Sequence, residues 1–141
     1  MNSNELAHNR NHAQEPDQQA VVGLCELGRH AVFYAAVMGW AVFPLAPGAK
    51  TPLPGSHGCK DGTKDINQIL DWWGAMPDAN ICIATGPDSG CFVLDVDLYK
   101  PGTREVLEEL AKKHGRFPKT VMATSARGGR HLYYRYPSEG I

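Results

Sequence analysis

The chain has 141 residues, of which 43% are hydrophobic and 21% are charged, and its formal net charge is −1. This length and composition predict one ordinary soluble globular domain with a core of its own. The longest uncharged apolar run, residues 31–45, is shorter than the ~20 residues that a membrane-spanning helix needs. Gly39 and Pro44 also interrupt it, so we expect no membrane segment and no membrane partner.

From the N-terminus, residues 1–17 are polar and aperiodic, which predicts a disordered tail. Apolar residues then recur at helical spacing, which predicts one helix over residues 18–38. The β-rich stretch 40–45 predicts a short strand. Residues 46–64 carry three prolines and four glycines, a composition typical of a long ordered loop, and such loops are often functional.

Asp65 is suited to cap a helix that runs through residue 73. Short apolar runs predict strands over residues 80–84 and 91–98. A charged helix is expected over residues 104–114. We expect Thr103 to cap that helix, and its buried stripe to be Leu107, Leu110 and Ala111.

The last two strands are predicted over residues 120–125 and 131–136. A short turn with two consecutive glycines joins them, which is typical of a β-hairpin. We therefore expect one domain over residues 18–141, of the α+β class, with a mixed or antiparallel sheet and flanking helices.

The cysteines are Cys25, Cys59, Cys82 and Cys91, and no pair has the C-x-x-C spacing of a zinc knuckle or a thioredoxin-like site. No signal-peptide pattern is present, so we expect reduced thiols in a cytoplasmic protein.

Charge is unevenly distributed along the chain. Residues 1–97 hold 5 Lys and Arg against 11 Asp and Glu, and residues 98–141 hold 9 against 4, which gives balances of −6 and +5. A basic surface beside an acidic site would produce this asymmetry, and so would two normally solvated faces.

Two acids stand in the apolar run 91–98. Because side chains alternate across a strand, Asp95 and Asp97 are expected on one face, with Cβ atoms roughly 7 Å apart. Carboxylates so placed can converge on a divalent cation such as Mg²⁺, which takes one or two protein carboxylates plus water and phosphate oxygens. Alternatively, the two acids mark where a strand reaches solvent. A D-x-D pattern also occurs in glycosyltransferases and, followed by Thr, in phosphatases, but here Tyr99 occupies the Thr position.

The hairpin sequence TSARGGRHLYYR, residues 124–135, carries the second group of candidate residues. Gly128 and Gly129 let the backbone approach an anion, and Arg127 and Arg130 can add charge-assisted bonds to phosphate. His131 can contact a phosphate if its face of the sheet is the one that carries the acids. A basic hairpin with an exposed histidine is the competing interpretation.

Together, GWAVFPLAPGAKTPL, FVLDVD and SARGGRHLYYR, in this order, resemble the N-terminal domain of bifunctional DNA primase/polymerases in the archaeo-eukaryotic primase superfamily. The resemblance extends from about residue 35 to residue 136. It implies an α+β core related to RNA-recognition motifs, preceded by an additional N-terminal α/β unit. It also implies a replication protein of plasmid, phage or integrated-element type.

The resemblance also implies roles for individual residues. Asp95 and Asp97 would bind the metal, and His131 would contact the triphosphate of the incoming nucleotide. Two Mg²⁺ or Mn²⁺ ions would bridge the carboxylates and the triphosphate. The residues expected beside the phosphates are Ser125, Arg127, Gly128, Gly129 and Arg130, with Lys50 in the basic loop.

The implied partners are a single-stranded DNA template, NTP or dNTP, and a helicase domain in a longer parent protein. The superfamily has a third motif, an aspartate on a strand downstream of the hairpin, whereas this sequence offers only Glu139 there. We therefore expect a C-terminally truncated domain, either a fragment or a short gene product. Three functions stay open, namely nucleotidyl transfer, nucleotide or DNA binding without catalysis, and a metal-dependent phosphatase or glycosyltransferase.

Overall fold

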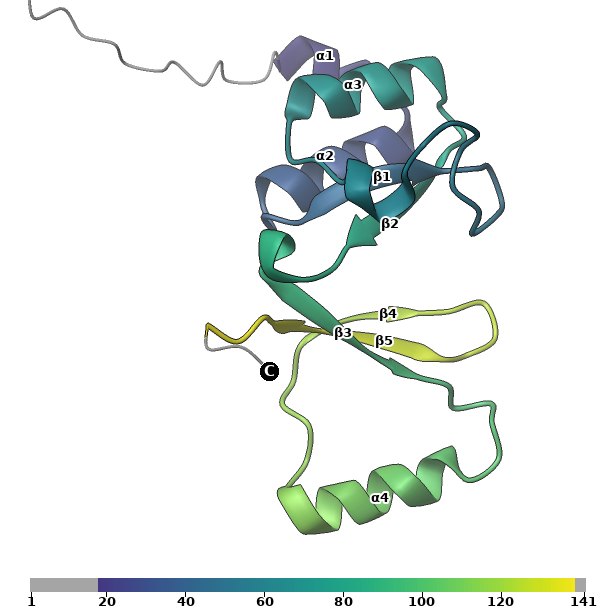
Figure 1. The fold of residues 1–141 in the computed structure, drawn as a ribbon, viewed down its shortest axis with the longest axis vertical. Helices are drawn as coiled ribbons and strands as arrows, with labels where there is room; N and C mark the ends of the chain where they lie inside the picture. Colours follow the sequence, from purple (N-terminus) through teal and green to yellow (C-terminus); the bar gives the residue numbers. More distant parts are fainter. Residues whose placement is uncertain (1–17, 139–141) are drawn as a thin grey trace, which may run out of the picture.

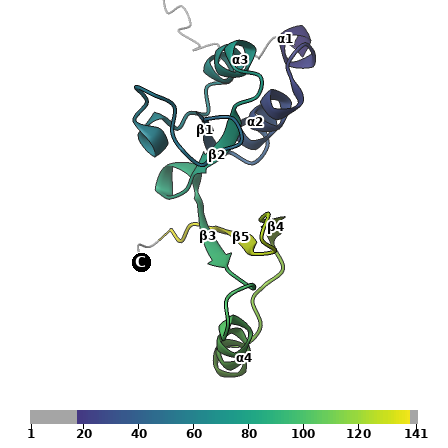
Figure 2. The same cartoon turned by 90° about the vertical axis from the view of Figure 1, so that its right-hand side faces the viewer.

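The structure is a computed structural model, and it describes residues 18–138. The predicted tail 1–17 and Glu139 lie outside the described residues. Helices and two small antiparallel sheets alternate along the chain, which confirms the α+β class. The elements form two units stacked along the long axis of the molecule, and the narrow profile in Figure 2 shows both of them.

The N-terminal unit, residues 18–84, consists of three helices and a two-stranded sheet (Figure 1). Strands β1 and β2 pair antiparallel, with Phe43 opposite Cys82. The long predicted loop lies between β1 and α3 and contains one 3₁₀-helix, η1 (Gly58–Asp61). The elements are α1 (Gln18–Val22), α2 (Glu26–Ala36), β1 (Ala41–Leu45), α3 (Ile66–Ala75) and β2 (Asn80–Ala84).

The C-terminal unit, residues 91–136, consists of a three-stranded antiparallel sheet and one helix. The strand order is β3-β5-β4, so the last strand in the chain lies in the middle. The predicted β4–β5 hairpin is confirmed by antiparallel pairing of these neighbours. The elements are β3 (Cys91–Val96), α4 (Thr103–His114), β4 (Val121–Thr124) and β5 (Arg130–Arg135), and a 3₁₀-helix, η2 (Pro87–Ser89), precedes them.

The predicted helix 18–38 is wrong in one respect, because the structure divides it into α1 and α2. Cys25 has an extended backbone, and its Sγ accepts a hydrogen bond from the Gly28 N–H at 3.3 Å, so Cys25 is the N-cap of α2. Periodicity alone did not reveal the break, since Leu24 is buried on the same side as the rest of the stripe. The Asp65 cap is confirmed, because its carboxylate accepts from the Asn67 N–H at 2.9 Å.

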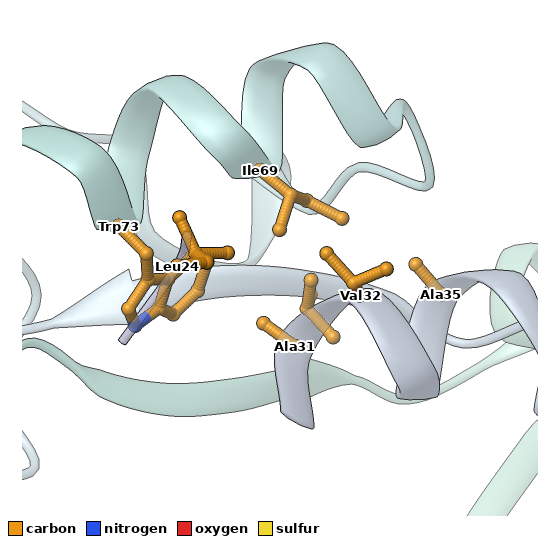
Figure 3. Close-up of a cluster of buried hydrophobic side chains, with 7 residues drawn as sticks. Leu24, Ala31, Val32, Ala35, Ile69 and Trp73 are labelled. Atoms are coloured by element: carbon orange, nitrogen blue, oxygen red, sulfur yellow. The ribbon is translucent and has the colours of Figure 1, made fainter. Parts of the chain in front are cut away.

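The core of the molecule lies between α2, α3 and β1. Figure 3 shows Ile69 and Trp73 of α3 pointing toward Val32 and its neighbours on α2, and Val42 of β1 belongs to the same cluster. Trp73 is 1% exposed, and its indole N–H donates to the Ala79 carbonyl at 3.0 Å. Burial of this large ring with its polar atom satisfied makes α3 the anchor of the unit.

The predictions for α4 need two corrections. Gly102, with φ of 81°, occupies the N-cap position without any side-chain cap, and Thr103 is the first helical residue. No α4 residue is buried, and Leu110 of the expected stripe is 40% exposed. Leu107 and Ala111 are half-buried and line a groove of about 710 Å³ between α4 and the sheet, so the helix covers the sheet only loosely.

The two units are connected through residues 85–90, which hydrogen-bond to the N-terminal unit, and through one aromatic stack. The Ala41 N–H donates to Ser89 Oγ at 2.9 Å, and that hydroxyl donates in turn to the Ala84 carbonyl. The ring of Trp40 stacks on Tyr133 with centroids 4.8 Å apart. Every helix in residues 18–138 is too short or too polar to traverse a lipid bilayer.

Candidate functional site

The side chains of Asp95 and His131 lie on the same face of the three-stranded sheet. Strands β3 and β5 pair antiparallel with Asp95 directly opposite His131, and directly opposed residues share a face. His131 Nε2 lies 3.5 Å from Asp95 Oδ1, a separation that becomes an ion pair when the imidazole is protonated. Asp95 is largely exposed and His131 about one-third exposed, so both groups are accessible to a ligand.

This face of the sheet borders a cleft of about 700 Å³ between the two units. The C-terminal unit contributes Val93, His131 and Tyr133, and the N-terminal unit contributes Phe43 and Cys82. Burial raises the pKa of Tyr133, so its hydroxyl stays protonated at neutral pH. The cleft therefore has largely apolar walls with the imidazole at one side.

Lys50 lines the same cleft, although the sequence places it some 80 residues from His131. It lies in the loop that follows β1, and it is exposed. Among residues 18–138 it has neither a hydrogen bond nor an ion pair, so its ammonium group is available to an anion. Lys50 and His131 thus line one cleft, and Asp95 lies beside that histidine.

Asp97 is positioned differently from Asp95. Strand β3 ends at Val96, and the Asp97 carboxylate forms an ion pair with Lys100. The hydrogen bond from Lys100 holds the pKa of Asp97 below its ordinary value, and Tyr99 and Arg127 lower it further. In turn, Asp97 and, more weakly, Asp95 raise the pKa of Lys100. The ammonium group of Lys100 therefore lies beside the acidic pair.

The Gly-Gly turn brings the hairpin loop against the end of β3. Gly128 has φ of 82°, which favours glycine, and its N–H donates to the Ser125 carbonyl at 2.9 Å. Gly129 is buried, and a Cβ there would lie 2.9 Å from Ser125 Oγ and 3.6 Å from Asp97 Oδ1. Gly129 is therefore close to both Ser125 and Asp97, and the predicted contact of this motif with substrate phosphates stays a prediction.

The two arginines of the hairpin, Arg127 and Arg130, lie in different parts of the C-terminal unit. The guanidinium of Arg127 lies 5.9 Å from the centroid of the Tyr99 ring and acts electrostatically on Asp97. Arg130 is paired with Val96 and shares its face, which is the face toward α4, and it lines the groove there. Arg130 and His131 face opposite sides of the sheet, because adjacent residues of a strand point to opposite faces, and the predicted contact of Arg130 with phosphate stays a prediction.

Within residues 18–138, no three His, Cys, Asp or Glu side chains converge on a point where a metal ion could bind. Asp95 and Asp97 nevertheless offer the carboxylate oxygens that Mg²⁺ and Mn²⁺ prefer, and Mg²⁺ commonly completes its shell with water and substrate phosphate. Lys100 also shows that the acidic pair attracts positive charge in this structure. The donor set fits a divalent ion that shares its coordination with a phosphate ligand.

Three features of the site were missed from the sequence. The spacing of Asp97 and Lys100, three residues apart, could have suggested their ion pair. The stack of Tyr34, Trp40 and Tyr133, with centroid separations of 5.9 and 4.8 Å, joins residues far apart in the chain. Asn80, whose side-chain amide bonds the Ala49 carbonyl at 2.8 Å across 31 residues, also lines the cleft. No local pattern indicates the last two.

The model of one protein family, described as "Bifunctional DNA primase/polymerase, N-terminal", matches residues 31–140. The match therefore covers most of the chain and includes β1, the acidic strand β3 and the hairpin. No curated protein and no solved structure matches the chain.

Proposed function

The chain belongs to the family of bifunctional DNA primase/polymerase N-terminal domains, and from this premise we propose that its inter-unit cleft binds a nucleoside triphosphate and transfers the nucleotide to a primer or initiating nucleotide on single-stranded DNA. Membership alone implies a primase/polymerase domain that binds nucleotides and DNA. The proposal extends this statement to particular residues and to a reaction.

One observation carries the proposal, namely that Lys50 and His131 line the same cleft and Asp95 lies 3.5 Å from that histidine. Lys50 and His131 can donate hydrogen bonds to the oxygens of a triphosphate, and the Asp95 carboxylate can bind the divalent ion that accompanies it. The apolar walls, which include Phe43 and Tyr133, are suited to a nucleobase.

In this proposal Lys50 and His131 donate hydrogen bonds to phosphate oxygens and offset negative charge as it shifts toward the leaving group. Asp95 and Asp97 would hold Mg²⁺ or Mn²⁺, for which Asp97 must exchange its ion pair with Lys100. A bound divalent ion would neutralise charge on the phosphates and favour ionisation of the attacking hydroxyl. The described residues beyond Leu98 are rich in Lys and Arg, which suits sequence-independent contact with the DNA backbone.

The test is incorporation of labelled nucleotide on a primed and an unprimed single-stranded template, with Mg²⁺ or Mn²⁺. We expect Asp95→Asn and His131→Ala each to reduce incorporation by about 10²-fold or more. Asp88→Asn is the matched control, because Asp88 is an exposed carboxylate in η2 away from the cleft. Wild-type incorporation that persists in both cleft variants would exclude the proposed roles.

A second function, nucleotide binding without catalysis, is favoured by the ion pair between Asp97 and Lys100. If Lys100 keeps this carboxylate occupied, the cleft can bind a triphosphate but the acidic pair cannot act together. Calorimetry with dATP and Mg²⁺ distinguishes the two functions, since binding without incorporation supports the second. Lys100→Met removes the ion-pair partner of Asp97. A rise in incorporation in that variant would support the first function, nucleotide transfer.

A further inference from the structure

The loop that carries Lys50 is tied at its base by its own backbone. The Ala46 N–H donates to the Thr51 carbonyl at 2.9 Å, and the Ala49 N–H donates to the Ala46 carbonyl at 3.1 Å. Leu45 and Pro52 form an isolated bridge just below these bonds. The bonds close the loop on itself, but none of them connects the tip to the rest of the N-terminal unit.

The side chain of Asn80 makes that connection. Asn80 is the first residue of β2 and pairs with Leu45 at the end of β1. Its Nδ2 donates a hydrogen bond to the carbonyl of Ala49, the residue directly before Lys50, at 2.8 Å. Asn80, Ala49 and Lys50 all line the cleft between the units, and Asn80 is half-buried.

We propose that Asn80 is a positioning residue that holds Lys50 at the cleft for contact with the substrate triphosphate, a role that rests on the function proposed above. A lysine on an untethered loop would lose conformational freedom when it binds phosphate, and that loss weakens binding. A loop already fixed at residue 49 loses less. Because Asn80 is paired with Leu45 in the sheet, its side chain is held in place to make the hydrogen bond to Ala49.

The amide of Asn80 suits this role, and a carboxylate could not replace it at neutral pH. An amide can donate to the Ala49 carbonyl, whereas an aspartate of the same shape offers only acceptor oxygens and would repel it. A carboxylate there would also attract the Lys50 ammonium away from an anionic ligand. Asn80→Asp therefore reverses the contact without changing the volume of the side chain, and Asn80→Ala removes it.

The first experiment measures binding of dATP with Mg²⁺, and of inorganic tripolyphosphate, to the full chain. We expect Asn80→Ala to weaken both about 2- to 10-fold, the range for one net hydrogen bond. In a Lys50→Ala background the same substitution should have no further effect, because Asn80 acts through Lys50. Effects that multiply in the double variant, or an unchanged affinity in Asn80→Ala, would overturn the proposal. Asn67→Ala, an exposed asparagine on α3, is the control.

The second experiment does not depend on any ligand. Hydrogen exchange in residues 46–51 should be faster in Asn80→Ala and Asn80→Asp than in the wild type, with exchange in α3 unchanged. If the wild type binds neither probe, the proposed function fails, and exchange still decides whether Asn80 holds the loop. Unchanged exchange in both variants would show that it does not.

Discussion

The two units of the molecule differ in where their apolar residues lie. In the N-terminal unit Val42, Ile69 and Trp73 are at most 1% exposed and form one cluster between α2, α3 and β1. In the C-terminal unit α4 has no buried residue, and Val121 and Met122 of β4 are about half exposed. Asp95 and His131, the predicted metal-binding acid and phosphate-contacting histidine, belong to the C-terminal unit. Buried apolar packing is thus concentrated in the N-terminal unit, whereas the candidate acid and histidine lie in the C-terminal unit, and the cleft forms where the two units meet.

Among substitutions that only remove contacts, the largest effect should come from truncating Trp73, which anchors the N-terminal unit. Trp73→Ala deletes a fully buried ring and its hydrogen bond to Ala79, and we expect a loss of about 3–5 kcal/mol in the free energy of unfolding. Denaturant titration measures this loss, and Trp73→Phe provides a milder variant if the first does not fold. Leu107→Ala on α4 should cost less than about 1 kcal/mol. Equal losses for the two alanine variants would mean that the units do not differ.

A smaller loss of stability is expected when the aromatic stack between the two units is removed. Trp40→Leu removes two ring contacts, with Tyr34 at 5.9 Å and Tyr133 at 4.8 Å, and should cost about 1–3 kcal/mol at roughly 0.5–1.5 per pair. Amide exchange should rise more in β3 and β5 than in α3, because the lost stack ties the weaker unit to the stronger. Phe33→Leu, which affects one edge contact of a half-exposed ring, is the control. A uniform rise across both units would contradict the tethering role.

A substitution on the open side of the C-terminal unit should hardly change stability. Met122 is 48% exposed, so Met122→Lys should shift the free energy of unfolding by less than about 0.5 kcal/mol. The same change should reduce concentration-dependent association, measured by sedimentation, since exposed apolar surface promotes it. Val42→Lys places a charge in the core and should prevent folding. Severe destabilisation by Met122→Lys would show that β4 is packed more tightly than its exposure indicates.

The smallest expected effect is a change in the pH dependence of stability, and it comes from Asp61 in the long loop between β1 and α3. The Asp61 carboxylate accepts from the His57 backbone N–H at 2.7 Å, which is the main reason that the pKa of Asp61 is lowered. A carboxyl group with a lower pKa in the folded state adds stability above its unfolded pKa, about 3.9. That contribution disappears as pH falls through the folded value.

Thermal unfolding between pH 7 and pH 2 tests this contribution. The wild type should lose slightly more stability on acidification below about pH 4 than Asp61→Asn, in which the titrating group is absent. Asp71→Asn, an exposed carboxylate on α3, should behave like the wild type. A carboxyl resonance of Asp61 that titrates at or above its ordinary value would contradict the lowered pKa.

Much of the local structure was predictable because it follows from local rules. The alternation of side chains in β3 and the Gly-Gly turn predicted an acidic strand and a basic hairpin, and the Asp65 cap was visible in its residue type. The α1–α2 break was missed because Cys25 as an N-cap leaves the hydrophobic period intact. The buried stripe of α4 was overestimated because periodicity shows which face is apolar and not whether anything covers it.

The sequence by itself determined which groups are candidates for binding a phosphate and on which elements they lie, since spacing along a strand decides its faces. Only the tertiary structure decided which groups meet. The register of β3 against β5 places Asp95 opposite His131, the Asn80 bond ties the Lys50 loop to β2, and Lys100 engages Asp97. Two of these contacts join residues about thirty or more positions apart, and packing of the whole chain fixes such distances.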